Sequence, residues 1–239
     1  MRWLRDMTPV ELSAAIEEGR PLLLAAGCVE CHGNHLPLGT DTIIAEAVAR
    51  EVAARCDGVV APTIDYGPTG YAVSGSDRGT VDVVAEAFYA YAKAALGGLV
   101  RLGFRSVFVI VHHQGPDGPE AAAFHFAGAA LFNELSADRG PGWWGEREPR
   151  PSPTVRVVAT IPPEIEGAVR GDHAGRTETS LLLHLSAERV DLQALRVRDF
   201  WYNWSPGQES RSATAQLGRD IFESMVAAVE RVVSRPAGT

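Results

Sequence analysis

Short, continuously apolar runs alternate along this chain with longer stretches in which apolar residues recur at helical spacing. The clearest run, VFVIV, has no polar residue at alternate positions, which is typical of a parallel strand buried on both faces. On this criterion we predict strands at Pro21–Ala26, Gly58–Pro62, Ser106–Val111 and Thr154–Thr160.

Helices are predicted between and after these strands. Thr8 and Glu11 form a capping box around Pro9, a residue suited to the first helical position. Other helices are expected at Thr42–Arg55, Asp82–Leu102, Pro119–Leu135, Glu178–Ala187 and Ser212–Arg231. Strands that alternate with helices predict an α/β fold, namely a three-layer α/β/α sandwich with a mostly parallel central sheet.

Polar loops follow the four predicted strands, after Ala26, Pro62, Val111 and Thr160. In a parallel sheet covered by helices, ligands bind outside the carboxyl ends of the strands. We therefore expect these loops to meet at one edge of the sheet and to carry the functional site.

Composition narrows the class of protein. The chain has 239 residues, enough for one large domain or at most two small ones, and a formal net charge of -8. An acidic surface repels nucleic acid and anionic lipid. There is no apolar run of membrane-spanning length and no signal core, and three cysteines do not suggest a disulfide framework. We expect a soluble, cytoplasmic protein without nucleic-acid or membrane partners.

The segment from Glu30 to Asp41 (ECHGNHLPLGTD) concentrates metal-binding chemistry directly after the first predicted strand. Glu30, His32, His35 and Asp41 supply carboxylates and imidazoles, which are ligands for Zn, Mn or Fe. The alternative is a polar loop of surface and capping residues, in which Asp41 caps the following helix.

A C-x-x-C-H pattern, typical of covalent haem attachment, overlaps this segment at Cys28, Cys31 and His32. Haem attachment normally takes place outside the cytoplasm, and the three methionines offer no convincing axial ligand. We therefore disfavour a c-type haem protein, which would show Soret absorbance when purified.

Three blocks of sequence resemble the creatininase family. Glu30 to Asp41 is similar to the family pattern E-Q-H-G-x-H-L-P-x-x-x-D, with Cys31 in place of glutamine. Residues 111–115 (VHHQG) stand where the family has N-G-H-G-G-N, and residues 173–180 (HAGRTETS) resemble H-A-G-x-x-E-T-S. The resemblance implies one creatininase-like domain over residues 1–239. It also implies hydrolysis of a non-peptide carbon–nitrogen bond, of the cyclic-amide or formamide type, by metal-bound hydroxide.

The resemblance implies two divalent metal ions (zinc, manganese or iron) that share Asp41 as a bridging ligand. Glu30 and His113 would complete one position. His32 would bind at the second position together with a further carboxylate.

That further carboxylate is displaced in this chain. Creatininase proper carries it two residues after the strand-end histidine, where this chain has Gly115. The resemblance implies Glu178 as the substitute. Asp117 is an alternative, although in the sequence Gly-Pro-Asp-Gly it could equally be a turn residue.

By resemblance His173 is the acid–base residue that protonates the leaving nitrogen, a task suited to the pKa of imidazole, and Glu178 is grouped with it as catalytic. The alternative for His173 is a bond to the backbone at a helix start.

We expect His35 to support the ligand loop through a hydrogen bond. His112 should face away from the site, because adjacent strand residues point to opposite faces. Two helical histidines, His125 and His184, are expected to pack or to lie on the surface.

Several possibilities remain open beside this interpretation. The protein could be a formamide hydrolase, a peptidase of the same family or a metal-binding relative without catalysis. The resemblance suggests a homo-oligomer, often a hexamer, that acts on a small-molecule amide. Aromatic residues either line the substrate pocket or cover a core edge or interface, and they are Tyr66, Tyr71, Trp143, Trp144, Trp201, Tyr202 and Trp204.

The position of the missing carboxylate gives a direct test. We expect Glu178→Gln to lower bound metal or activity sharply, because it removes the charge of a ligand. The matched change Asp117→Asn should have little effect on either. Metal content of the two purified variants checks this, and the opposite result would move the ligand to the Gly-Pro-Asp-Gly turn.

Overall fold

The computed structural model describes residues 2–143, 153–195, 200–204, 206–207 and 209–234, the side chain of Asp138 excepted. Its sheet has five strands in the order β1-β3-β2-β4-β5, and all four pairings are parallel. The strands are β1 (Arg2–Trp3), β2 (Leu22–Ala26), β3 (Val59–Val60), β4 (Ser106–Val111) and β5 (Thr154–Ala159).

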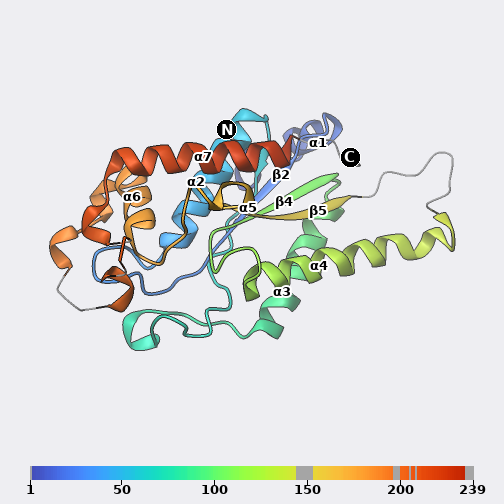
Figure 1. Ribbon diagram of the computed structural model, residues 1–239. Coiled ribbons are helices and arrows are strands. Elements are labelled where there is room, and N and C mark those ends of the chain that lie inside the picture. The colour runs from blue at the N-terminus through green and yellow to red at the C-terminus, as the bar shows by residue number, and fades with distance from the viewer. Residues whose placement is uncertain (1, 144–152, 196–199, 205, 208, 235–239) are drawn as a thin grey trace.

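Helices cover both faces of the sheet, which confirms the predicted three-layer α/β/α sandwich (Figure 1). One layer contains α2 (Thr40–Arg55), α6 (Arg176–Leu185) and α7 (Ala215–Val233), and the other contains α3 (Ala85–Arg101) and α4 (Pro119–Ser136). Shorter helices are α1 (Pro9–Glu17) and α5 (Pro163–Glu166). No helix among the described residues is long and apolar enough to cross a membrane.

The apolar runs of the central strands are explained by two separate cores. Leu23 and Ala25 of β2 pack with α2, α6 and α7, whereas Leu22, Leu24 and Ala26 pack on the opposite face. Because successive side chains of a strand point to opposite faces, a strand between two helix layers needs apolar residues at every position.

Most predicted elements are confirmed within a few residues, and their differences have local causes. Thr8 and Glu11 form the predicted capping box at the start of α1. Helix α3 begins at Ala85, later than predicted, and Asp82 instead accepts hydrogen bonds from the backbone N–H groups of Thr69 and Gly70 (2.8 and 2.6 Å). Strand β1 was not predicted, since two residues carry no periodic signal.

Glycine permits an unusually close contact between α6 and α7. A Cβ atom at Gly218 of α7 would lie 1.8 Å from the carbonyl oxygen of Ser180. At Gly98 of α3, by contrast, an added Cβ would meet no atom within 4 Å. Both glycines lie within helices, but only Gly218 has no room for a side chain.

We expect Gly218→Ala to lower the free energy of unfolding by about 1–3 kcal/mol, because the two helices must separate. Its control, Gly98→Ala, should raise that free energy by about 0.5–1 kcal/mol, because alanine loses less backbone entropy on folding. Urea unfolding of both variants checks this. Equal effects of the two changes would contradict the close packing of α6 on α7.

Candidate metal and active site

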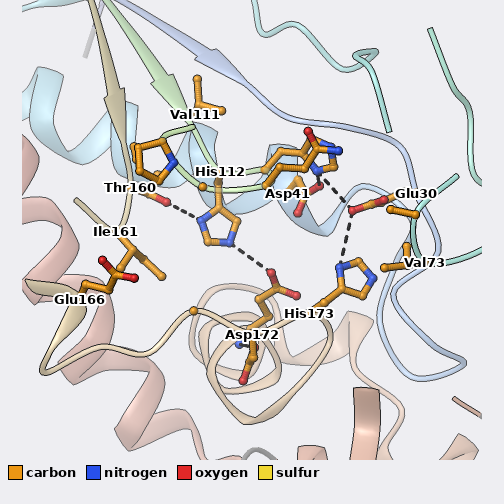
Figure 2. Close-up of a pocket in the computed structure, with 18 residues that line it drawn as sticks. Glu30, Asp41, Val73, Val111, His112, Thr160, Ile161, Glu166, Asp172 and His173 are labelled. Atoms are coloured by element: carbon orange, nitrogen blue, oxygen red, sulfur yellow. Dashed lines mark hydrogen bonds and ion pairs between the residues drawn. The ribbon is translucent and has the colours of Figure 1, made fainter. Parts of the chain in front are cut away.

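Loops from four parts of the chain meet in a cavity of about 380 Å³ at the carboxyl ends of the strands (Figure 2). Each loop that was predicted to gather there contributes lining residues, among them Glu30, Val73, His112 and Thr160. The start of α6 closes the cavity with residues that include His173 and Glu178. The prediction that these loops meet at one edge of the sheet is therefore confirmed.

Asp41 lies at the centre of this site and is only 2% exposed. Its Oδ1 atom is 3.2 Å from Nε2 of His32, and its Oδ2 atom is 2.9 Å from Nδ1 of His113. Each carboxylate oxygen thus faces a different imidazole, which is the arrangement that a bridging ligand requires.

A close approach of the backbone places Asp41 there. A Cβ atom on Gly27, the first residue after β2, would lie 2.9 Å from Cβ of Asp41 and 2.8 Å from the backbone nitrogen of Thr42. Glycine is needed at this point because any side chain would push the first turn of α2 away from the strand. Asp41 lies within that turn and does not cap the helix, since Gly39 is the N-cap residue and no side chain caps it.

Two groups of potential ligands share Asp41. Glu30, Asp41 and His113 form one group, and His32, Asp41 and Glu178 form the other, with the ligand atoms of each group within 4.8 Å of one another. These are the residues that the resemblance to the creatininase family implied for the two positions. Glu30, His32 and His173 form a third group of this kind, so His173 is geometrically an alternative ligand.

The histidines are oriented by bonds to backbone carbonyl groups. Nδ1 of His32 donates to the carbonyl oxygen of Glu30 (3.0 Å), and Nε2 of His113 points to that of Pro68 (3.4 Å). Since a carbonyl oxygen only accepts, the neutral rings keep their lone pairs on Nε2 of His32 and Nδ1 of His113. Both lone pairs face Asp41, and this pattern is common among metal-binding histidines.

Burial and mutual contact shift the proton affinities of these groups. Burial opposes protonation of His32, but the charges of Asp41, Glu178 and Glu30 outweigh it and raise its pKa to about 10. Burial also disfavours the charged form of Asp41, yet His32 and His113 hold the pKa of that carboxyl well below its usual range. The cluster is therefore a strong electrostatic sink for positive charge, which protons or metal ions can supply.

Glu178, and not Asp117, reaches the site. Its Oε2 atom accepts a hydrogen bond from the backbone N–H of Ala174 (2.6 Å) and lies 3.6 Å from Nε2 of His32. Asp117 is exposed and does not line the cavity, whereas Gly115 lines it with a φ of 75°. The geometry favours the substitution of Glu178 for the carboxylate that Gly115 cannot supply.

His173 makes a backbone bond, as the alternative drawn from the sequence expected, and its ring also lines the cavity. Its Nε2 atom donates to the carbonyl oxygen of Cys31 (2.8 Å), while its Nδ1 atom lies 3.6 Å from Oε1 of Glu30 at the cavity wall. The ring is packed against His32 and Tyr202, with centroid separations of 4.3 and 4.8 Å. The backbone bond thus holds the ring in a fixed orientation without removing it from the cavity.

The expectation for His112 is wrong. Its ring lines the same cavity as His113, and its Nε2 atom is 3.5 Å from Oε1 of Glu178. The alternation of a strand does not apply, because β4 ends at Val111 and the chain then turns, with Gln114 at a φ of 57°.

The remaining predicted residues lie outside the cavity. Nε2 of His35 is 2.9 Å from Oγ1 of Thr179, the neighbour of Glu178, so the predicted supporting bond is present. His125 is exposed and His184 packs on Phe222, as expected. Trp144 lies outside the described residues. Of the other aromatic residues considered from the sequence, none lines the cavity: Tyr202 is buried behind His173, for example, and Trp201 is exposed.

A three-layer parallel α/β fold that gathers buried carboxylates and imidazoles at its strand ends is typical of a metal-dependent hydrolase. The sequence model described as creatininase, creatinine amidohydrolase, matches residues 5–233. The chain therefore belongs to the creatininase family, whose members include hydrolases that act on carbon–nitrogen bonds, such as creatinine amidohydrolase. This assignment replaces the c-type haem alternative.

Two curated relatives are mycofactocin precursor peptide peptidases. The one from Mycobacterium ulcerans is 34% identical over 184 residues, which cover 71% of this chain and 60% of the relative. The one from Mycobacterium tuberculosis is 33% identical over 250 residues, covering 90% of this chain and 84% of the relative. The chain thus spans less than two thirds of the first relative and most of the second.

Solved structures agree on the fold. A crystal structure of creatinine amidohydrolase matches with a TM-score of 0.76 at 20% identity, covering 98% of both chains. A manganese creatininase matches with a TM-score of 0.76, and a mutant creatininase of the Zn-Zn type with 0.75, both at 21% identity. Divalent ions are thus named for proteins with this fold.

The shared position of Asp41 predicts a distinctive loss. We expect Asp41→Asn to lower metal content at both positions at once, because each group of ligands loses the same carboxylate charge. Asp77→Asn, in a side chain that is 80% exposed, should leave metal content unchanged. Elemental analysis of both variants checks this, and retention of one full equivalent by Asp41→Asn would show that Asp41 is not shared.

Proposed function

We propose that this chain is a two-metal amidohydrolase. Glu30, His113 and Asp41 would hold one divalent ion, and His32, Asp41 and Glu178 would hold the second. The observation that carries the proposal is that the two oxygens of Asp41 face different imidazoles at 3.2 and 2.9 Å. Zinc, manganese and iron all suit these nitrogen and oxygen donors.

The residues of the site fit such ions in charge as well as in geometry. Glu30, Asp41 and Glu178 carry three negative charges in full burial, where uncompensated carboxylates are unfavourable. Neutral imidazoles complete the two positions without adding positive charge. When bound, two divalent ions supply a water with a pKa lowered toward about 7 and a Lewis acid for the substrate carbonyl.

His173 is the proposed proton donor to the leaving nitrogen. Because Nε2 donates to the carbonyl of Cys31, the neutral ring accepts a proton only at Nδ1, the atom nearest Glu30 in the cavity wall. The protonated ring can then donate from Nδ1 to the departing nitrogen. Contact with Tyr202 and the Cys31 carbonyl keeps this atom directed inward.

The proposed substrate is an amide whose neighbouring groups on the same molecule are uncharged or basic. No lysine or arginine lines the cavity among the described residues, so a free carboxylate on the substrate would find no side-chain cation there. Glu166 and Asp172, which also line the cavity, are acidic residues. The curated relatives, which are named mycofactocin precursor peptide peptidases, favour the peptidase branch.

Turnover of a panel of amides distinguishes these branches. The panel contains a short peptide related to a mycofactocin precursor, a formamide and creatinine, and products are followed by mass spectrometry with the metal-loaded chain. Cleavage of the peptide supports the peptidase branch, and cleavage of the formamide or a cyclic amide supports the non-peptide branch. A metal-loaded chain that hydrolyses none of them would contradict the catalytic proposal. The family resemblance also implies a homo-oligomer, often a hexamer, and light scattering tests this.

We expect His173→Ala to leave metal content near normal and to lower turnover by about 10²–10⁴-fold, the usual range for loss of an acid–base group. His113→Ala should lose metal as well as turnover, because its Nδ1 atom is a proposed ligand. Elemental analysis together with a turnover assay checks both variants. If His173→Ala empties one position while His113→Ala keeps both ions, the roles of the two histidines are reversed.

A further inference from the structure

His112 is a buried imidazole for which the proposed mechanism has no task. It is 7% exposed and lines the cavity directly after the end of β4. Its Nδ1 atom contacts Oγ1 of Thr160, at the end of β5, and its ring points inward from there (Figure 2). Its Nε2 atom has no hydrogen-bond partner among the described residues and lies 3.5 Å from Oε1 of Glu178.

Glu178 has two carboxylate oxygens with different surroundings. Oε2 accepts from the backbone N–H of Ala174 at 2.6 Å and faces Nε2 of His32. Oε1 faces His112. The terminal torsion of a glutamate is soft, so one fixed oxygen does not set the plane of the carboxylate. A donor on Oε1 sets that plane and directs Oε2 toward the metal position.

We propose that His112 is a positioning residue that orients Glu178 as a ligand of the second metal ion, an inference that rests on the proposed two-metal function. A carboxylate only accepts, so Nε2 of His112 carries the proton and donates to Oε1 of Glu178. Nδ1 then accepts from the hydroxyl of Thr160, which fixes this tautomer. A small torsional movement brings the 3.5 Å contact into the usual hydrogen-bond range of roughly 2.7–3.2 Å.

Direct ligation by His112 is less consistent with the geometry. The three groups whose ligand atoms converge within 4.8 Å include His32, Asp41 and Glu178 but not His112. The ring approaches the oxygen of Glu178 that is turned away from His32. His112 therefore acts on the ligand and not on the ion.

Zinc affinity of the two positions in the full-length chain tests this inference, by titration against a competing chelator. We expect His112→Ala to weaken the second ion by roughly 10–100-fold, as is typical when a partner of a ligand is lost, and to leave the first nearly unchanged. Two further variants test the roles of the two ring nitrogens separately. His112→Gln places an amide nitrogen near the position of Nε2 and should restore most of the affinity, whereas His112→Asn places one near Nδ1 and should not.

Two further variants distinguish loss of the contact between His112 and Glu178 from a general packing defect. Thr160→Val keeps the side-chain volume and removes only the hydroxyl that fixes the tautomer of His112. It should therefore weaken binding of the second ion by a smaller factor. In a Glu178→Gln background, His112→Ala should cause no additional loss. The melting temperature and the affinity of the first position report whether each variant folds.

The outcomes are distinguishable from failure of the proposed function. A wild-type chain that binds no second ion overturns the two-metal proposal and this inference with it. A wild-type chain that binds two ions, with unchanged second-ion affinity in His112→Ala, overturns the positioning role alone. Equal loss in His112→Gln and His112→Asn overturns the donor role of Nε2.

Discussion

The structure of this site depends on the sharing of one buried carboxylate, Asp41, between two imidazoles. At 2% exposure an isolated carboxylate would be unfavourable, and the compensating positive charge comes from protonation of His32 and His113, which face its two oxygens, or from bound metal ions. Its place in the first turn of α2 adds the favourable field of the helix N-terminus. Glu30 and Glu178 bring further negative charge to the same point, so the cluster as a whole needs cations to balance its charge.

The fold supplies this convergence through its sheet order. β2 and β4 are neighbours at the middle of the sheet, so the loops that follow them, with Glu30 and His113, leave the sheet side by side. Asp172 accepts hydrogen bonds from the backbone N–H groups of Thr177 and Glu178 at the start of α6 (2.7 and 3.2 Å). That anchoring presents Glu178 and His173 to the cavity from the opposite side. The site is thus built at the carboxyl ends of parallel strands, where such folds generally bind ligands.

The sequence was sufficient for the layers of the fold and, through the family resemblance, for several residues that line the cavity, among them Glu30, Asp41, His113 and Glu178. Apolar runs predicted the central strands because both their faces are buried, and the spacing from Glu30 to Asp41 marked the ligand loop. The orientation of His112 could not be predicted, because it depends on where β4 ends and on a left-handed turn at Gln114. The contact between His112 and Glu178 joins residues far apart in the chain, and no local pattern reports it.

Anomalous diffraction from crystals grown with zinc or manganese tests the central claim most directly. The account predicts two peaks per chain on either side of the Asp41 carboxylate, about 3.5–4 Å apart, the separation typical of paired-metal sites. One peak should lie beside Glu30 and His113, and the other beside His32 and Glu178. Metal-replete crystals with no peak near Asp41, or with a single ion that Asp41 does not contact, would contradict it.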